Sequence, residues 1–223
     1  MEVIMKALIF FDINGTIIKR DSRTDLPYSD AIDEYLNLTG GMEGINTSAR
    51  SDKDVFHEVL DRNNLEFTDD LWEGFLNVYE NHLKAYETSD VWRENADAVP
   101  FIKALSKSDH LLTMITGELS IGAEYKLRKL GVWKYFPTGG FGEDGLKRFE
   151  IADAALEKAK SIYGTDFDQM YVIGDTLLDI QTARHLGAKV IAIATGSNTK
   201  EELAALNPDY LIESFKEIES LFF

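Results

Sequence analysis

The sequence predicts an α/β protein, in which a parallel sheet with surrounding helices carries an all-helical insertion near the amino terminus. Short apolar segments alternate with helical segments through the second half of the chain, and repeated strand–helix units favour a parallel sheet with right-handed crossovers. Another apolar segment stands at Val3–Phe11, and the stretch that follows it has helical signals only. We therefore expect a core domain of residues 1–17 and 95–223, and a helical domain of residues 18–94.

The composition is that of a globular protein and excludes several classes of function. The chain has 223 residues, of which 44% are hydrophobic and 28% charged, and its formal net charge is −16. The absence of Cys excludes disulfides, thiolate metal sites and cysteine nucleophiles, and it fits a cytoplasmic protein. The acidity disfavours nucleic acid and anionic membranes as partners. We expect a monomer or homodimer that binds small molecules.

The first apolar segment has the character of a buried strand. Val3–Phe11 is interrupted by Lys6, is preceded by Glu2 and ends at Asp12. A secretory signal needs a basic flank before its apolar region, and a membrane-spanning helix needs about 20 apolar residues. The segment is also too short and too continuously apolar for an amphipathic helix, so we expect a central strand buried on both faces.

The remaining elements follow from capping signals, glycine stops and apolar runs. Helices are expected to begin at Ser29, Ser51 and Thr68 in the insertion. The further strands are expected at His110–Ile115, Met170–Ile173, Val190–Ala194 and Tyr210–Ile212. The further helices are expected at Val99–Ser106, Ser120–Leu130, Phe149–Tyr163, Leu178–Leu186 and Lys200–Leu206, with one more at the end of the chain.

Polar side chains follow three of the expected strands. The segments concerned are Asp12–Thr16, Thr116–Glu118 and Gly174–Asp179, and the pair Lys147 and Arg148 precedes a helix of the core. Ligands of open parallel sheets bind outside the carboxyl ends of the strands. We therefore expect these groups to meet at one edge of the sheet.

The residue types at this edge point to phosphoryl chemistry. Asp12 and Asp175 supply hard oxygen ligands that suit Mg²⁺, and a carboxylate beside such an ion can attack a phosphoryl group to give an aspartyl-phosphate. The backbone N–H groups after Asp12, beginning with Ile13, together with the Thr116 hydroxyl and a cation, would hold the phosphoryl oxygens. Gly117 lets the backbone approach a ligand closely.

Each of these residues alone also has an ordinary structural interpretation. Asp12 could be a loop residue, Lys147 and Arg148 a solvated pair, and Asp175 and Asp179 the cap and first turn of a helix. The Thr–Gly pair at position 116 is common in turns. Their coincidence at matching strand ends favours the functional interpretation.

Three segments resemble motifs of the haloacid dehalogenase-like superfamily. Phe10–Ile17 resembles its first motif, Met114–Gly117 its second and Val172–Asp179 its fourth, so that the resemblance covers nearly the whole chain. The segment Gly187–Ser197 resembles the phosphoglycolate-phosphatase-like branch. This resemblance implies a Rossmann-like core with a helical cap inserted after the first motif, and a Mg²⁺-dependent phosphatase of a small phosphorylated metabolite.

The resemblance also implies roles for individual residues. Asp12 would be the nucleophile, and Thr116 with a cation of the third motif would hold the phosphate. Mg²⁺ would be held by Asp12, Asp175 and the backbone carbonyl of Asn14, with Asp179 beside them. The Lys–Pro pair usual in the third motif is missing, and we prefer Arg148 over Lys147 as its cation. Arg50 resembles the basic residue that family caps direct toward the substrate, although a solvated residue before a helix is an equal alternative.

Asn14 departs from the family pattern. Phosphatases of the family usually have Asp there, which protonates the leaving oxygen and then activates water, whereas an amide has no usable proton. The sequence leaves three explanations open: an engineered Asp→Asn change, a natural pseudo-enzyme, or recruitment of another acid such as Glu118 or a cap residue. Besides a phosphatase, we therefore keep a non-catalytic module that binds a phosphate ligand or a protein, and a phosphomutase, as alternatives.

Overall fold

A parallel sheet of five strands forms the centre of the molecule, as the sequence predicts. A computed structural model describes residues 6–223, so the start of the strand expected at Val3 lies outside the described residues. The sheet order is β2-β1-β3-β4-β5, and every pair is parallel. The strands are β1 Ala7–Phe11, β2 Leu111–Met114, β3 Gln169–Gly174, β4 Lys189–Ile193 and β5 Tyr210–Ile212.

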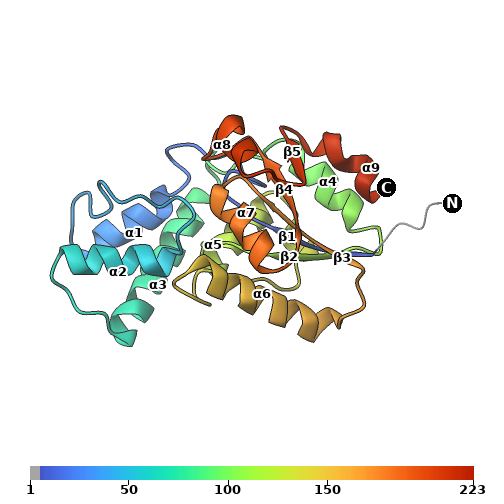
Figure 1. Ribbon diagram of the computed structural model, residues 1–223. Helices are drawn as coiled ribbons and strands as arrows, with labels where there is room; N and C mark the ends of the chain where they lie inside the picture. The colour runs from blue at the N-terminus through green and yellow to red at the C-terminus, as the bar shows by residue number, and fades with distance from the viewer. Residues whose placement is uncertain (1–5) are drawn as a thin grey trace.

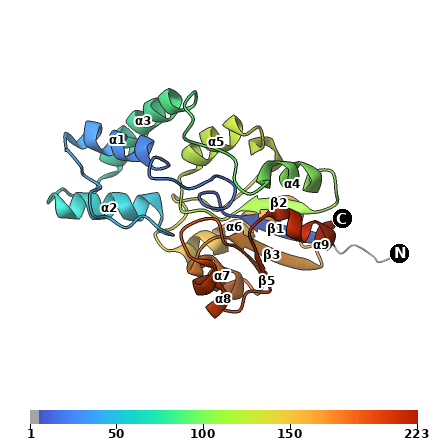
Figure 2. The same ribbon diagram turned by 90° about the horizontal axis from the view of Figure 1, so that it is seen from above.

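Helices cover both faces of the sheet (Figures 1 and 2). Leu8 and Phe10 of β1 pack in one hydrophobic cluster with α6 (Arg148–Tyr163), α7 (Leu177–His185) and α8 (Lys200–Ala205). Ile9 and Phe11 belong to the cluster of the other face. That face is covered by α4 (Ala98–Leu105), α5 (Ser120–Lys129), the 3₁₀ turns η1 (Trp133–Tyr135) and η2 (Phe215–Ile218), and α9 (Glu219–Phe222).

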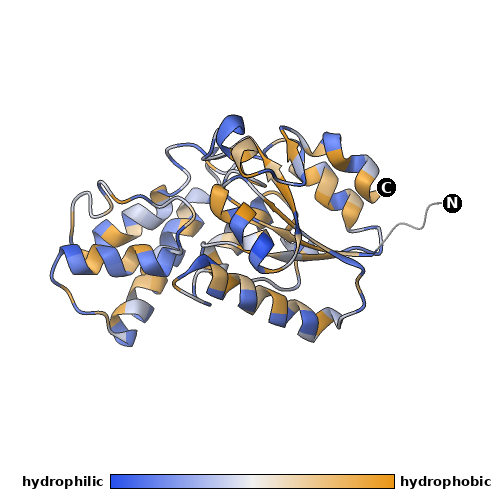
Figure 3. Ribbon diagram, in the orientation of Figure 1, coloured by the Kyte–Doolittle hydropathy of each residue, from blue (hydrophilic) through white to orange (hydrophobic). Residues whose placement is uncertain are grey.

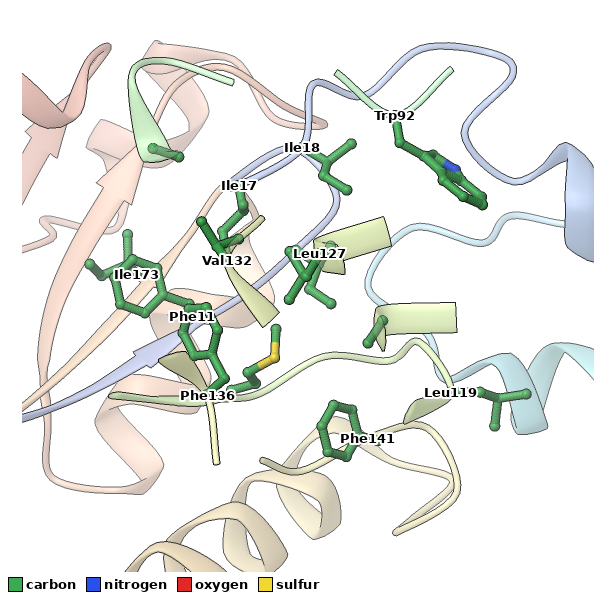
Figure 4. Packing of buried hydrophobic residues seen from close by; sticks show 14 of the residues in the cluster. Phe11, Ile17, Ile18, Trp92, Leu119, Leu127, Val132, Phe136, Phe141 and Ile173 are labelled. Atoms are coloured by element: carbon green, nitrogen blue, oxygen red, sulfur yellow. The ribbon is translucent and has the colours of Figure 1, made fainter. Parts of the chain in front are cut away.

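The hydrophobic core explains why β1 lacks the alternation of a one-sided strand. All five of its residues are buried, and Figure 3 shows the central strands as mostly apolar while the surrounding helices carry polar outer faces. On the second face, Phe11 packs edge-on against Phe136, with ring centroids 5.6 Å apart. Figure 4 shows this cluster continuing from Phe11 through Leu127 to Trp92, so that one core reaches from the sheet to the segment that returns from the helical insertion.

Three helices between residues 18 and 94 form a separate unit at one end of the sheet (Figure 1). They are α1 (Leu26–Leu36), α2 (Asp52–Arg62) and α3 (Asp69–Tyr86), and they share an aromatic core of Tyr28, Phe56, Phe75 and Tyr79. We call this part the α1–α3 unit.

Two of the three expected helix starts in this unit are confirmed. Ser51 and Thr68 cap α2 and α3, each accepting a hydrogen bond from a backbone N–H in the first turn. The prediction of a start at Ser29 is wrong, because α1 already begins at Leu26. Pro27 lies in its first turn, where the missing N–H of proline has no intrahelical partner to lose.

Three helices of the core begin one residue earlier than expected. Helix α4 starts at Ala98, α6 starts at Arg148, and α7 starts at Leu177 with Thr176 as its cap. Thr176 and Asp179 form the capping box of α7, in which the Asp179 carboxylate accepts from the Thr176 N–H at 3.0 Å. Asp175 therefore does not cap this helix.

The α1–α3 unit is tied to the core at the two points where the chain crosses between them. Lys19 N donates to Arg93 O at 2.9 Å, and Asn95 N donates to Ile17 O at 2.9 Å. The Asn95 amide also donates to Gly15 O at 2.7 Å. These bonds hold the outgoing and returning strands side by side directly after β1.

The unit also docks on the core through the start of α2. Asp52 N donates to Gly117 O at 2.7 Å, and Leu119 N donates to the Asp52 carboxylate at 2.9 Å. A Cβ at Gly117 would lie 2.0 Å from Arg50 O, so the close approach of α2 requires glycine at this position. Within residues 6–223, no helix is long and apolar enough to cross a membrane.

Candidate active site

Three buried carboxylates meet where β1 and β3 end. The register pairs Phe11 with Ile173, so Asp12 and Asp175 follow the strands at neighbouring points, and Asp179 joins them from the first turn of α7. One carboxylate oxygen of each residue lies within 4.8 Å of those of the other two. Such a set of hard oxygen donors fits Mg²⁺, which keeps several waters and binds through few carboxylates.

Arg148 lies in the same cluster. It is the first residue of α6, its side chain is 3% exposed, and its Nη2 donates to Asp12 Oδ1 at 2.9 Å and to Asp179. Its Nε is buried and has no hydrogen-bond partner in the described part of the chain, which leaves one donor for an oxyanion. The Lys147 side chain is 71% exposed and lies 3.6 Å from Asp54. Of the two cations considered, the structure brings only Arg148 to the carboxylates.

Three carboxyl groups share one buried cation in this cluster, and their burial disfavours the charged form. Burial raises the pKa of Asp12 to about 8, an effect that Arg148 opposes and that Asp179 and Asp175 reinforce. Burial and the neighbouring Asp179 also raise the pKa of Asp175 to about 6, against the hydrogen bond from Ser197 N. A divalent cation would favour the charged form of both carboxyls, so the electrostatics of the cluster also fit a metal.

Backbone and glycines fix the position of Asp175. Ser197 N donates to Asp175 Oδ2 at 2.6 Å, and the Thr16 hydroxyl lies 3.4 Å from Oδ1. A Cβ at Gly15 would lie 2.5 Å from the carboxyl group, and Gly15 has φ of +95°. The loop after β1 can therefore pass Asp175 only with glycine at position 15.

Asn14 is held by an ion pair that the sequence analysis did not identify. Its Nδ2 donates to Glu118 Oε2 at 3.1 Å, and its Oδ1 accepts from Lys126 Nζ at 3.2 Å. Lys126 Nζ also lies 2.7 Å from Glu118 Oε1, and both side chains are less than 5% exposed. Burial raises the pKa of Glu118, and Lys126 opposes this shift.

Lys126 is not among the site residues expected from the sequence, because most lysine side chains are exposed to solvent. The signal that could have identified it is its position on α5, where it stands three residues after Ala123 on the buried side of the helix. A lysine on an apolar helical face needs a buried partner, which here is Glu118, two residues before the helix begins.

The other expected residues of the second motif and of the first loop are also placed around this cluster. Thr116 is 2% exposed, and its hydroxyl accepts from Glu118 N at 3.2 Å. Ile13 is fully buried in the hydrophobic core, so it can offer only its backbone to a ligand. Thr116, Gly117 and Glu118 all line the cavity that contains the carboxylates.

That cavity lies between the strand ends and the α1–α3 unit. It has a volume of about 680 Å³, including the part open to solvent. Its core side contains Asp12, Asn14, Thr116, Lys126, Arg148, Asp175 and Asp179. Its other side contains Arg20, Thr24, Asp25, Tyr28, Thr47, Arg50, Asp52 and Tyr79.

Arg50 lines the cavity as expected for a cap residue, but its charge is already paired. Its Nε donates to Asp54 Oδ2 at 2.7 Å, and its Nη1 donates to Glu58. Arg20, which the sequence analysis did not consider, is the other arginine of this side and donates to Asp25 at 3.4 Å and to Thr47 at 3.1 Å.

Comparison with known proteins agrees with this arrangement. Residues 9–184 match the family model of the haloacid dehalogenase-like hydrolases. The phosphoglycolate phosphatase of Neisseria meningitidis is 28% identical over 94% of this chain and 91% of its own length. The pyrophosphatase PpaX of Bacillus velezensis is 22% identical over 94% of this chain and 93% of its own length.

Solved structures share the fold. A hydrolase from Pseudomonas syringae superposes with a TM-score of 0.70 at 17% identity, covering 96% of each chain. At this identity the likeness concerns the fold alone, and it includes both the sheet and the inserted helices because nearly all of each chain is matched.

Proposed function

The chain belongs to the haloacid dehalogenase-like hydrolase family, and we propose that it is a Mg²⁺-dependent phosphatase of small phosphorylated metabolites. The observation that supports this function best is the position of Asp12. This carboxylate lies at the end of the central strand, inside the cavity, 2.9 Å from the buried Arg148 and beside two further carboxylates. A nucleophile, a phosphate-binding cation and candidate metal ligands are thereby within reach of one phosphoryl group.

In the proposed reaction, an Asp12 oxygen attacks the phosphorus and the bond to the leaving oxygen breaks. The leaving oxygen takes up a proton, and water then attacks the aspartyl-phosphate to release inorganic phosphate and restore Asp12. Arg148 and the Thr116 hydroxyl hold the phosphoryl oxygens while negative charge develops on them. Mg²⁺, held by Asp12, Asp175, Asp179 and the Asn14 carbonyl, would supply further charge neutralisation when bound.

Asn14 is the observation that favours a second candidate function, a non-catalytic module that binds a phosphate ligand. The amide cannot supply the proton that the leaving oxygen needs. Asn14 is nevertheless in contact with Glu118 and Lys126, and the rest of the site keeps its charged groups in contact with one another. We therefore propose slow turnover rather than its complete loss, with Glu118 as the nearest carboxyl that could replace the missing acid.

The test compares phosphate release by this chain and by its Asn14→Asp variant in the presence of Mg²⁺. We expect kcat to rise at least about tenfold in the variant, within the range of a positioned acid–base, and KM to change little. The matched control is Asn77→Asp, which makes the same chemical change on the exposed side of α3 and should leave kcat unchanged.

The outcomes separate the candidates. Phosphate binding without phosphate release in either chain would favour the binding module. Equal and rapid turnover in both chains would show that another group, Glu118 first, already acts as the acid. A long-lived phosphoenzyme that passes its phosphoryl group back to a sugar phosphate would favour a phosphomutase.

A further inference from the structure

The side of the cavity that faces the reacting carboxylates carries eight residues with charged or hydroxyl groups, beside four apolar ones (Pro27, Met42, Ala49 and Val55). We call the residues contributed to it by the chain between residues 20 and 79 the outer wall, and its polar members are Arg20, Thr24, Asp25, Tyr28, Thr47, Arg50, Asp52 and Tyr79. In the proposed reaction the phosphoryl group lies at Asp12, so the leaving group must be accommodated against this wall. Its chemistry therefore restricts what the leaving group can be.

Arg50 is the cation of the outer wall that donates the most hydrogen bonds. Its Nε and Nη2 donate to the side chain and to the carbonyl of Asp54, at 2.7 and 3.2 Å, and its Nη1 donates to Glu58 and to Asn46 O. Asp54 and Glu58 do not line the cavity. The guanidinium is thus turned to two carboxylates of α2, and its charge is neutralised before any ligand enters.

The other two cations near the leaving group are also paired. Arg20 donates to Asp25 at 3.4 Å, and Lys126 lies 2.7 Å from Glu118 on the core side. No cation among the residues that line this part of the cavity lacks a carboxylate partner. An anionic leaving group would therefore have to compete with an existing ion pair.

Asp52 adds to the outer wall a carboxyl group that has no cationic partner within the described residues. It is buried, its Oδ2 accepts from Leu119 N at 2.9 Å, and no Lys, Arg or His of residues 6–223 lies within 4.0 Å of its oxygens. Burial and the charge of Glu118 raise its pKa well above the usual range. With the further partners of Asp54 and Glu58 included, five cations (Arg20, Arg50, Arg62, Lys126, Lys147) face five carboxyl groups (Asp25, Asp52, Asp54, Glu58, Glu118), so the region carries no excess of positive charge to offer.

We propose that the leaving group of the substrate is uncharged and carries hydroxyl groups, so that this protein hydrolyses the phosphate ester of a polyol or sugar. The inference rests on the proposed phosphatase function and names its substrate class. A carboxylate or phosphate placed against this wall would lose its hydration without gaining a free cation. A hydroxyl group can donate to the carboxyls of Asp25 and Asp52 and accept from Thr47 or Arg20, without breaking a pair.

The proposed substrate class differs from the substrates named in two relatives of this chain, phosphoglycolate phosphatase and the pyrophosphatase PpaX. Phosphoglycolate and pyrophosphate both have anionic leaving groups, glycolate and phosphate. A site for such a group needs a cation that the protein does not itself neutralise. The shared fold therefore does not imply that the substrates are the same.

Three two-carbon phosphate esters test the proposal, because they differ only in the charge of the leaving group. They are hydroxyethyl phosphate (neutral), phosphoglycolate (anionic) and phosphoethanolamine (cationic). Phosphate release is measured with Mg²⁺ on the full chain and on its Asn14→Asp variant. We expect kcat/KM for hydroxyethyl phosphate to exceed that for phosphoglycolate at least about tenfold, the discrimination expected of a site that hydrogen-bonds a substrate hydroxyl, and not to fall below that for phosphoethanolamine.

A double variant then tests the physical reason. Asp54→Asn with Glu58→Gln removes both carboxylate partners of Arg50 while keeping the shapes of the side chains, and it should free a cation for the leaving group. We expect the ratio of kcat/KM for phosphoglycolate to that for hydroxyethyl phosphate to rise at least about tenfold. The matched control is Asp70→Asn with Glu73→Gln on the exposed side of α3, which changes the net charge equally and should leave the ratio unchanged.

The results that overturn the inference differ from those that overturn the function. A preference for phosphoglycolate or phosphoethanolamine, or release of phosphate from acetyl phosphate but not from hydroxyethyl phosphate, would overturn the substrate class while leaving a phosphatase. A lack of phosphate release from all three esters and from acetyl phosphate, in both chains, would overturn the proposed function. Should the double variant fail to fold, the three-ester comparison on the unchanged chain still decides the question.

Discussion

The strand-end cluster and the outer wall line the same cavity with similar residue types, yet they hold their charges in different ways. In the strand-end cluster, backbone N–H groups hold two of the three carboxylates, since Ser197 N donates to Asp175 and Thr176 N donates to Asp179. In the outer wall, Asp52 accepts from a backbone N–H, but Arg50 is held by side chains, chiefly that of Asp54. Carboxylates held by the backbone are positioned by the fold, whereas paired side chains can change by single substitutions. We therefore propose that the strand-end cluster carries the reaction and that the outer wall determines specificity.

The largest effect on kcat should come from a substitution in the strand-end cluster. Asp12→Asn keeps the shape of the side chain but removes the nucleophile, so we expect kcat to fall at least about 10⁴-fold. The measurement uses the Asn14→Asp variant as the parent chain, and mass spectrometry of acid-quenched protein monitors the aspartyl-phosphate. The wall substitution Asp25→Asn should lower kcat far less and should leave the covalent intermediate detectable.

Turnover that survives in Asp12→Asn would contradict the covalent mechanism. Equal losses in Asp12→Asn and Asp25→Asn would remove the distinction between cluster and wall.

The position of residues at strand ends explains which part of the site could be predicted from the sequence. Asp12, Thr116 and Asp175 each directly follow a buried apolar run, so that the sheet alone brings them together, and the motifs imply their roles. The choice between Lys147 and Arg148 needed the structure, because α6 begins at Arg148 and its first turn directs this side chain to Asp12. The resemblance favoured Arg148, and the geometry agrees.

The features that could not be predicted depend on how side chains pack once the elements are in place. The contact of Asn14 with Lys126 and Glu118 is visible only once α5 packs over the loop after β1. Arg50 could be placed near the cavity by resemblance, but its neutralisation depends on the rotamers of Asp54 and Glu58. The helix start expected at Ser29 is wrong for a local reason, because Pro27 already fits the first turn of a helix that begins at Leu26.

A smaller effect concerns the pH dependence of the thermal stability of the metal-free protein. The pKa of Asp12 is raised to about 8 and that of Asp175 to about 6, so between their ordinary values and these values the folded chain binds more protons than the unfolded chain. The free energy of unfolding must therefore fall as the pH rises from about 4 to about 8. We expect the Tm of the metal-free chain to decrease over this range.

Millimolar Mg²⁺ should reverse this trend, because an ion that binds only the folded chain stabilises it and favours the ionised carboxylates. Thermal unfolding followed at several pH values, with Mg²⁺ or with EDTA, measures both effects. Asp175→Asn should reduce the shift produced by Mg²⁺, whereas Asp25→Asn in the wall should preserve it. A Tm that is independent of Mg²⁺ at pH 8 would argue against a metal site at the strand ends.

The smallest effect concerns Ser51, which connects α2 of the α1–α3 unit to the loop that leads to Arg148. Ser51 caps α2 by accepting from Asp54 N at 3.1 Å, and its hydroxyl also donates to Leu146 O at 3.3 Å, in the loop that leads to Arg148. Thr68 caps α3 in the same way, accepting from Leu71 N at 3.2 Å, at an exposed position. Replacing either residue by Ala should therefore destabilise the protein by a similar amount, about 1 kcal/mol.

Of the two variants, only Ser51→Ala should also change catalysis, because Ser51 contacts the loop that leads to Arg148 and Thr68 does not. We expect a few-fold rise in KM for hydroxyethyl phosphate with kcat nearly unchanged, since the nucleophile and its neighbours stay in place while the wall is held less closely against them. Chemical denaturation and steady-state kinetics on both variants measure the two quantities separately. If Thr68→Ala raises KM as much as Ser51→Ala does, the effect comes from the stability of the α1–α3 unit as a whole, and the contact with Leu146 has no part in positioning the wall.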